Sequence, residues 1–233
     1  MMSIHDGHRQ RLKNRFRQEG LDKFDEIQVL ELLLFYAIPQ KDTNPLAHAL
    51  LDHFGSLSQV LEAPAEELEK IPGVGSNVST LLNLTTDLAR YYMVNRMSQN
   101  EILTSTEKCG DYLLPYFFGR RNETVFILCL DAKCKVLGCK EVGEGSVNSA
   151  SVPIRRIVEM ALGMNATSVV LAHNHPSGLA LPSGDDVQTT RRLAVALDAV
   201  DIALADHIVV ADDDFVSMAQ SGLYIPDSCR LIV

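Results

Sequence analysis

Two histidines and one aspartate that could bind a single metal ion lie within a short stretch of this sequence. His173 and His175 are separated by one residue, and Asp186 follows shortly after them. Two neutral imidazoles, one carboxylate and one water form a tetrahedral zinc site whose open position marks a catalytic zinc rather than a structural one. Such an ion lowers the pKa of its bound water to about 7. The pattern therefore predicts a hydrolase that binds one Zn²⁺ per chain.

The flanking residues indicate how the three side chains could meet. Residues 167–172 form a short apolar run rich in β-branched side chains, which is typical of a buried strand. Side chains two apart on a strand share a face, so the two histidines at its end can present both rings to one ion. A helix is predicted from Ser183 to about Ala199, apolar at helical spacing. Asp186 in its first turn can turn back toward the histidines.

Ordinary structural roles can also account for each of these residues. Ser183 and Asp186 match the Ser-x-x-Asp capping box that begins many helices. A single histidine at the end of a strand is usually a polar surface residue. The full combination should occur by chance in on the order of one chain in a thousand at average composition. We therefore predict a metal site, in which a serine that caps the helix can still point its hydroxyl into a cleft.

The spacing His-x-His-x7-Ser-x2-Asp resembles the JAMM signature of the JAB/MPN+ metallopeptidases and matches it without departure. Over nearly the whole chain the sequence is similar to the RadC family, through these segments: 54–57, 71–75, 145–148, Arg155, 173–178, 182–186, 190–192, 206–210, Ser217 and 222–223. The resemblance implies a mixed α/β fold of the JAB/MPN type. It also implies zinc ligation by His173, His175 and Asp186, and a hydrogen bond from Ser183 to the tetrahedral intermediate.

The resemblance further implies an upstream glutamate near a glycine as the general base. Glu141 and Glu144 precede Gly145, and Glu144 lies closest to it, although neither has the most usual spacing. Residues 154–156 read Ile-Arg-Arg where many relatives have Pro-Arg-Glu. A base must lie within hydrogen-bond reach of its proton. We name Glu144 as the base and Glu141 as the alternative, and an exposed strand glutamate is the structural explanation for either.

Asp206 and His207 form a second polar group in the matching segments. They could support the metal ligands through hydrogen bonds, because histidine ligands usually donate their other ring N–H to such a partner. They could equally be a simple buried polar pair.

The length and composition suit two domains. Residues 1–95 are predicted to form a small all-α domain, and residues 101–233 a mixed α/β domain with a polar linker before it. The chain has 233 residues and a net charge of −9. No run approaches 18 apolar residues, so no membrane span is predicted. Without an apolar signal region at the N-terminus, we expect a cytoplasmic protein. The five cysteines are an odd number and are expected to stay reduced.

Residues 71–75 resemble the hairpin of a helix-hairpin-helix module, which binds the DNA backbone without reading sequence. Gly73 and Gly75 would let backbone N–H groups approach a phosphate at a helix N-terminus. The basic cluster that could assist includes Arg11 and Lys13. Four glutamates between residues 62 and 69 crowd the hairpin, which favours a helix turn without a ligand. Any DNA binding should therefore be weak, independent of sequence and strongly salt-sensitive.

Two functional hypotheses of different classes follow. The first is a zinc hydrolase that cleaves a peptide or isopeptide bond in a protein or peptide substrate. The second is a DNA-associated protein, linked to repair by the name of the RadC family, with a structural or vestigial zinc site. A nuclease is a weaker third hypothesis, because the sequence has no carboxylate cluster for a second metal ion.

Overall fold

The computed structural model describes residues 4–98, 101–144, 153–176 and 178–226. By its internal contacts the chain divides into two compact units, Met1–Ala89 and Arg90–Val233. The division falls inside one helix, whereas the sequence suggested a polar linker at residues 95–100. Residues 145–148, which contributed to the family resemblance, lie outside the described part of the chain.

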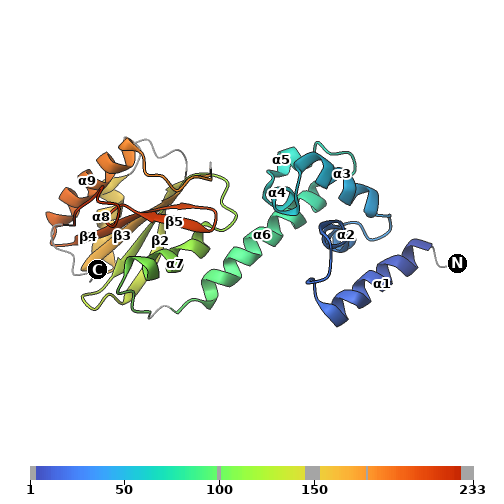
Figure 1. Ribbon diagram of the computed structural model, residues 1–233, viewed down its shortest axis with the longest axis horizontal. Helices are drawn as coiled ribbons and strands as arrows, with labels where there is room; N and C mark the ends of the chain where they lie inside the picture. Colours follow the sequence, from blue (N-terminus) through green and yellow to red (C-terminus); the bar gives the residue numbers. More distant parts are fainter. Residues whose placement is uncertain (1–3, 99–100, 145–152, 177, 227–233) are drawn as a thin grey trace. The chain divides into compact units, whose positions relative to one another are not determined.

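The first unit is helical (Figure 1). Its elements are α1 (Ile4–Glu19), α2 (Glu26–Ala37), α3 (Asn44–Phe54), α4 (Leu57–Glu62), α5 (Ala65–Leu68) and the first part of α6 (Ser76–Arg96). Leucines at helical spacing on α2 and α3, including Leu30, Leu34 and Leu50, are fully buried in one apolar cluster. Pro45, at the start of α3, fits a position where its missing N–H costs nothing.

The hairpin between α5 and α6 has the tight turn that the sequence predicted. Gly73 has a φ of +99°, a conformation that L-residues with a side chain rarely adopt. The N–H of Val74 donates to the carbonyl of Ile71 at 3.0 Å and closes the turn. α6 then begins at Ser76, directly after Gly75.

The second unit is built on a five-stranded mixed sheet with the order β2-β1-β3-β4-β5. Its strands are β1 (Thr124–Leu130), β2 (Val136–Glu144), β3 (Ser168–Asn174), β4 (Ala203–Ala211) and β5 (Asp214–Ser217). β3 and β4 are parallel, while β1 runs antiparallel to both β2 and β3. A parallel pair requires a crossover, which here is the helix α9 (Gly184–Asp198).

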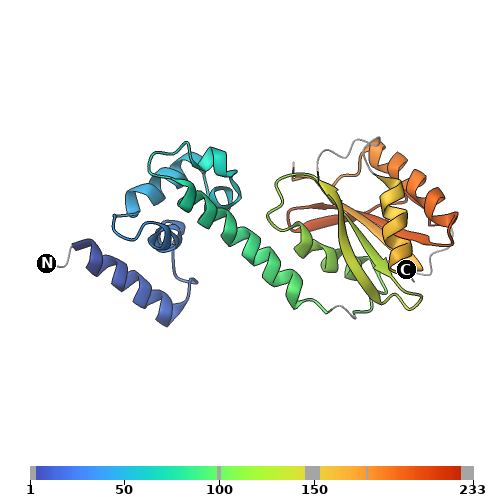
Figure 2. The same cartoon turned by 180° about the vertical axis from the view of Figure 1, so that it is seen from behind.

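Helices cover both faces of this sheet (Figures 1 and 2). The helices α8 (Ile154–Gly163) and α9 pack on one face, where Val125, Leu171 and Leu193 are buried. The helix α7 (Thr106–Phe117) packs on the opposite face against Phe126 and Val170. Neighbouring residues of a central strand thus enter different cores, which explains why β1 and β3 are buried along their whole length.

The predicted fold class is confirmed, since a helical region precedes a mixed α/β unit with helices flanking the sheet. The helix α7 was absent from the sequence interpretation, because its Gly110 and Pro115 weaken a helical pattern. Among the described residues, no helix combines the length and apolar character needed to cross a bilayer.

Candidate metal centre

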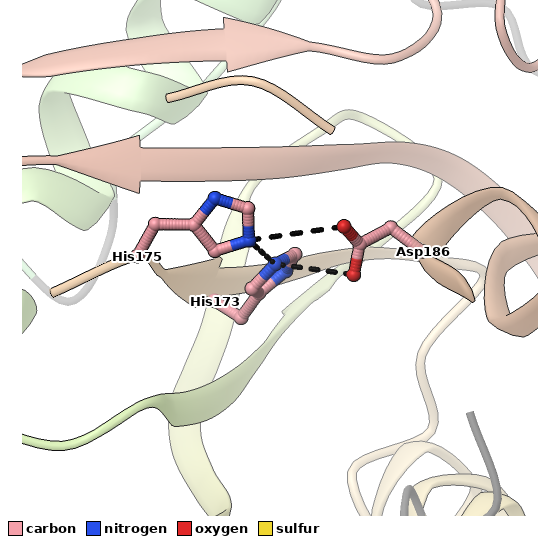
Figure 3. Close-up of side chains that lie close together, drawn as sticks. All are labelled: His173, His175 and Asp186. Atoms are coloured by element: carbon pink, nitrogen blue, oxygen red, sulfur yellow. Dashed lines mark hydrogen bonds and ion pairs between the residues drawn. The ribbon is translucent and has the colours of Figure 1, made fainter. Parts of the chain in front are cut away.

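The three predicted metal ligands converge in the structure (Figure 3). His173 is the penultimate residue of β3, and His175 follows the last residue of that strand. The N–H of His175 donates to the carbonyl of Val210 at 2.8 Å, so the chain is still held in the direction of the strand. The two Nε2 atoms are 3.0 Å apart, as expected for side chains that share one face of an extended chain.

The helix α9 supplies the third ligand through its capping box. Ser183 is the N-cap, and its hydroxyl accepts the N–H of Asp186 at 3.2 Å. In return, Oδ2 of Asp186 accepts both the N–H and the hydroxyl of Ser183, each at 2.7 Å. The carboxylate is almost completely buried, and its other oxygen, Oδ1, lies 3.3 Å from Nε2 of His173. The predicted capping box is confirmed, and the same carboxylate lies beside His173, where the predicted ligand role requires it.

These separations fit a tetrahedral zinc ion. Ligand atoms about 2.0–2.2 Å from zinc, at tetrahedral angles, lie about 3.3–3.6 Å from one another. The separations from Nε2 of His173 are 3.0 Å to His175 and 3.3 Å to Asp186, and Nε2 of His175 is 3.8 Å from Oδ2. Two imidazole nitrogens and one carboxylate oxygen are also the donor set that zinc accepts in catalytic sites. The residues present therefore fit the ion that the sequence predicted.

The proton of His175 can be assigned from its partner. Its Nδ1 lies 3.0 Å from the carbonyl oxygen of Leu179. A carbonyl can only accept a hydrogen bond, so Nδ1 carries the proton and donates it. When the ring is neutral, its lone pair is therefore on Nε2, which is directed toward His173 and Asp186, and this is the form that binds a metal ion.

Burial keeps the His173 imidazole neutral. Desolvation lowers the pKa of His173 from its usual value to about 4, partly opposed by the negative charge of Asp186. The electrostatic interaction with His175 lowers the pKa of His173 further, and that with Glu123 raises it. A ring with this pKa is uncharged at neutral pH and has a lone pair to offer a metal ion.

The structure does not bring Glu141 or Glu144 to this centre. In the sheet register, Glu141 pairs with Phe126 and Glu144 pairs with Thr124. These partners alternate with Val125, which pairs with His173, so both glutamates point to the face covered by α7. Glu141 binds Arg120 at 2.8 Å, and Glu144 is exposed and accepts from Asn122 at 2.9 Å.

A different carboxylate, Glu123, lies on the face of the metal ligands. It is two residues before Val125, so its side chain shares the side of Val125 and His173. Continuing the β1–β3 register by two residues sets it opposite His175. Its effect on the pKa of His173 places its charge within electrostatic range of the centre. The sequence interpretation missed Glu123, although a glutamate directly before a buried strand was a readable signal.

Asp206 and His207 have separate roles in the structure, because successive residues of β4 point to opposite faces. Oδ2 of Asp206 accepts from Ser217 at 2.5 Å, and Oδ1 accepts from the N–H of Ala219 at 3.1 Å. Desolvation raises the pKa of this aspartate. His207 lies on the other face, with its Nε2 2.8 Å from Nδ1 of His173. Only His207 of the two contacts a metal ligand.

Replacing Ser183 with alanine is expected to destabilise the protein by about 1 kcal/mol, within the range for lost N-caps. Metal affinity should fall by about tenfold, because Oδ2 of Asp186 loses one of its two donors. Ser183→Thr keeps the hydroxyl and serves as the control. Urea unfolding and chelator competition measure the two effects. An alanine variant as stable as wild type would contradict the capping role.

The hydroxyl hydrogen of Ser183 is donated to Asp186, so this arrangement supports a role in fixing the carboxylate. Donation to a substrate, as the family resemblance implied, would require that hydrogen bond to be exchanged. That role stays a prediction.

The residues predicted to bind DNA are all in the first unit. Gly73 and Gly75 are exposed on the hairpin, but the hydroxyl of Ser79 in α6 donates to Glu69 at 2.6 Å, and Lys70 is paired with Glu67. An acidic group beside the start of α6 disfavours a phosphate there.

Much of the predicted basic cluster is engaged within the unit. Arg9 donates to the carbonyl oxygens of Ile38 and Pro39 at the end of α2, and Arg15 donates to Gln28. The Lys13 ammonium lies 5.0 Å from the ring centre of Tyr36. Arg11 is exposed on α1. The cluster therefore holds α1 against α2 to a large extent, which is the ordinary explanation for a run of charges.

Comparison with known proteins agrees with the geometry. A family model described as a RadC-like JAB domain matches residues 103–223. A UPF0758 protein of Ruegeria pomeroyi is 34% identical over 215 residues, which is 92% of this chain and 96% of the relative. A UPF0758 protein of Fusobacterium nucleatum is also 34% identical, over 93% of this chain and 97% of the relative. One from Paraburkholderia xenovorans is 33% identical, over 90% and 83%. The matched residues include every side chain that converges on the candidate metal centre.

Proposed function

The chain belongs to the family of proteins with a RadC-like JAB domain, and we propose that it is a zinc-dependent hydrolase of peptide or isopeptide bonds. The observation that carries this proposal is the convergence of two imidazole nitrogens, 3.0 Å apart, with the carboxylate of Asp186, whose two oxygens lie 3.3 Å from His173 and 3.8 Å from His175. A second carboxylate is on the same face of the sheet. The group His173, His175 and Asp186 would hold the ion. His175 is the most accessible of the three, so it marks the side from which a substrate would approach.

A bound zinc ion would supply Lewis-acid polarisation of a substrate carbonyl and would lower the pKa of its bound water to about 7. The remaining contribution comes from the side chains of the chain itself. Burial keeps the His173 ring neutral, and the carbonyl of Leu179 holds the Nδ1 proton of His175, so each ring directs its Nε2 toward the ion. Asp186 supplies one negative charge, and Ser183 fixes that carboxylate by two hydrogen bonds.

Glu123 is the group best placed to move a proton. We propose that it accepts a proton from the attacking water and then delivers it to the nitrogen of the leaving amine. One carboxylate that faces the ligands and one metal ion suffice for amide hydrolysis. Among the described residues, the His173 group is the one set of metal-binding side chains, so a two-metal phosphodiester mechanism gains no support.

A hydrolysis assay tests the proposal. Metal-free protein should show no turnover on a panel of peptide and isopeptide substrates, and one equivalent of Zn²⁺ should restore it. Mg²⁺ is the control ion, because it prefers octahedral oxygen sites and should not restore activity. Zinc-loaded protein that stays inactive on the whole panel would instead favour the alternative, a DNA-associated protein whose zinc site is structural.

A further inference from the structure

A buried chain of hydrogen bonds joins two of the proposed metal ligands, His173 and Asp186. Nδ1 of His173 lies 2.8 Å from Nε2 of His207. On the other side of that ring, Nδ1 of His207 lies 2.6 Å from the hydroxyl oxygen of Thr190. The same hydroxyl lies 2.6 Å from the backbone carbonyl oxygen of Asp186. His173, His207 and Thr190 are each about 1% exposed, so water has little access to this chain.

The direction of every hydrogen bond follows from the carbonyl at its end. Two oxygens 2.6 Å apart need a hydrogen between them, and the carbonyl of Asp186 can only accept. The Thr190 hydroxyl therefore donates to Asp186 and accepts from Nδ1–H of His207. A neutral His207 then has a free lone pair on Nε2, which accepts from Nδ1–H of His173. The lone pair of His173 is left on Nε2, directed at His175 and Asp186.

We propose that Thr190 and His207 are positioning residues that fix His173 in the tautomer required for metal binding. This inference rests on the metal site of the proposed function and adds the residues that prepare it before the ion arrives. The other neutral tautomer of His173 would put a proton on Nε2, where the ion must bind. The Thr190 hydroxyl has one hydrogen, which it donates to the backbone carbonyl of Asp186. It can therefore only accept from His207, and this excludes the other tautomer of His173.

A different hydrogen-bond acceptor thus fixes the Nδ1 proton of each of the two histidine ligands. Leu179 accepts the Nδ1 proton of His175, and His207 accepts that of His173. The two Nε2 atoms lie 3.0 Å apart beside the carboxylate of Asp186. Such a cluster of acceptors favours a cation strongly over a neutral ligand. The thioether of Met218 lies 3.5 Å from the Thr190 hydroxyl and is too weak an acceptor to compete with the carbonyl.

The tautomer can be observed directly in the metal-free wild-type protein by ¹⁵N NMR of the imidazole nitrogens at pH 7.5. We expect Nδ1 of both His173 and His207 to be protonated and both Nε2 atoms to be unprotonated. Detection of a proton on Nε2 of His173 would overturn the proposal. This measurement needs neither activity nor a variant, so it is independent of whether the protein is a hydrolase.

Thr190→Val removes the hydroxyl and keeps the side-chain shape. His207 then loses its acceptor and can move its proton to Nε2, which forces the proton of His173 onto its own Nε2. We expect Zn²⁺ affinity, measured by chelator competition, to fall by about 10–100-fold, as for other partners of metal-binding histidines. The His173 tautomer signal should change in the same variant.

The neighbouring residue provides a matched control. Thr189 is equally buried, and its hydroxyl makes no hydrogen bond within the described residues. Thr189→Val should therefore keep wild-type Zn²⁺ affinity, while Thr190→Ser should retain most of it because serine restores the hydroxyl. If Thr190→Val and Thr189→Val bind Zn²⁺ equally tightly, the proposal is wrong. Should Thr190→Val fail to fold, the wild-type NMR spectrum still decides it.

Discussion

Replacing Glu123 with glutamine is expected to slow hydrolysis by a factor of about 10²–10⁴, the usual contribution of a general acid–base group. The amide keeps the size of the side chain but cannot take a proton from the attacking water. Metal content should not change, because Glu123 is outside the set His173, His175 and Asp186. The measurement is the turnover number of zinc-loaded wild type and variant on the same peptide substrate, together with the zinc bound per chain.

Glu141→Gln and Glu144→Gln are matched controls for this experiment. Both glutamates lie on β2, but their side chains point to the face of the sheet covered by α7. Neither change should alter turnover by more than a small factor. Loss of activity in Glu144→Gln, with full activity in Glu123→Gln, would return the base to the position favoured by the sequence resemblance.

The convergence of the three candidate metal ligands could be predicted from the sequence because the geometry that brings them together is local. His173 and His175 need only the two-residue repeat of an extended chain, and Asp186 needs only a helix start nearby. Both features are visible in a single short segment. The Ser183 capping box and the β3–α9–β4 crossover follow from the same local patterns.

Glu123, the proposed base, could not be predicted in this way because its position depends on strand pairing. Glu123 shares the face of the candidate metal ligands only because β1 lies antiparallel to β3 with Val125 opposite His173. Strand order and register are set by long-range packing, and a shift of one residue would turn Glu123 to the opposite face. Proximity in sequence to Gly145 instead favoured Glu144.

The hydrogen-bond partners of His173 were only partly predictable, for a related reason. The sequence indicated His207 as a possible support for the ligands, but it indicated neither Thr190 nor the separation of His207 from Asp206. His207 and Thr190 come from β4 and α9, and they meet only after the crossover helix packs onto the sheet. In the sequence, Asp206 and His207 look like one unit because they are adjacent. The alternation of β4 separates them, so Asp206 binds Ser217 on one face while His207 binds His173 on the other.

Replacing Asp186 with asparagine is expected to remove most of the bound zinc. The variant keeps the shape of the side chain, and its amide oxygen can still accept a hydrogen bond from Ser183, so the start of α9 should persist. The negative charge and the strong carboxylate ligand are both lost. We expect Zn²⁺ affinity to fall by more than about 100-fold, which exceeds the usual effect of changing a partner outside the ligand set. Elemental analysis after dialysis should find about one zinc per wild-type chain, as in sites of this type, and little in the variant.

Asp185→Asn is the control that separates ligation from general charge. Asp185 is the preceding residue in the same helical turn and is exposed, whereas Asp186 is 2% exposed and faces His173. Both substitutions remove one negative charge near the N-terminus of α9, so both weaken its favourable interaction with the helix dipole to a similar extent. Only Asp186→Asn removes a proposed ligand.

His173→Ala should repeat the loss of zinc, because it removes a second ligand without changing the helix. Full zinc retention in Asp186→Asn and His173→Ala would show that the ion binds elsewhere, and equal loss in Asp185→Asn and Asp186→Asn would assign the effect to charge alone.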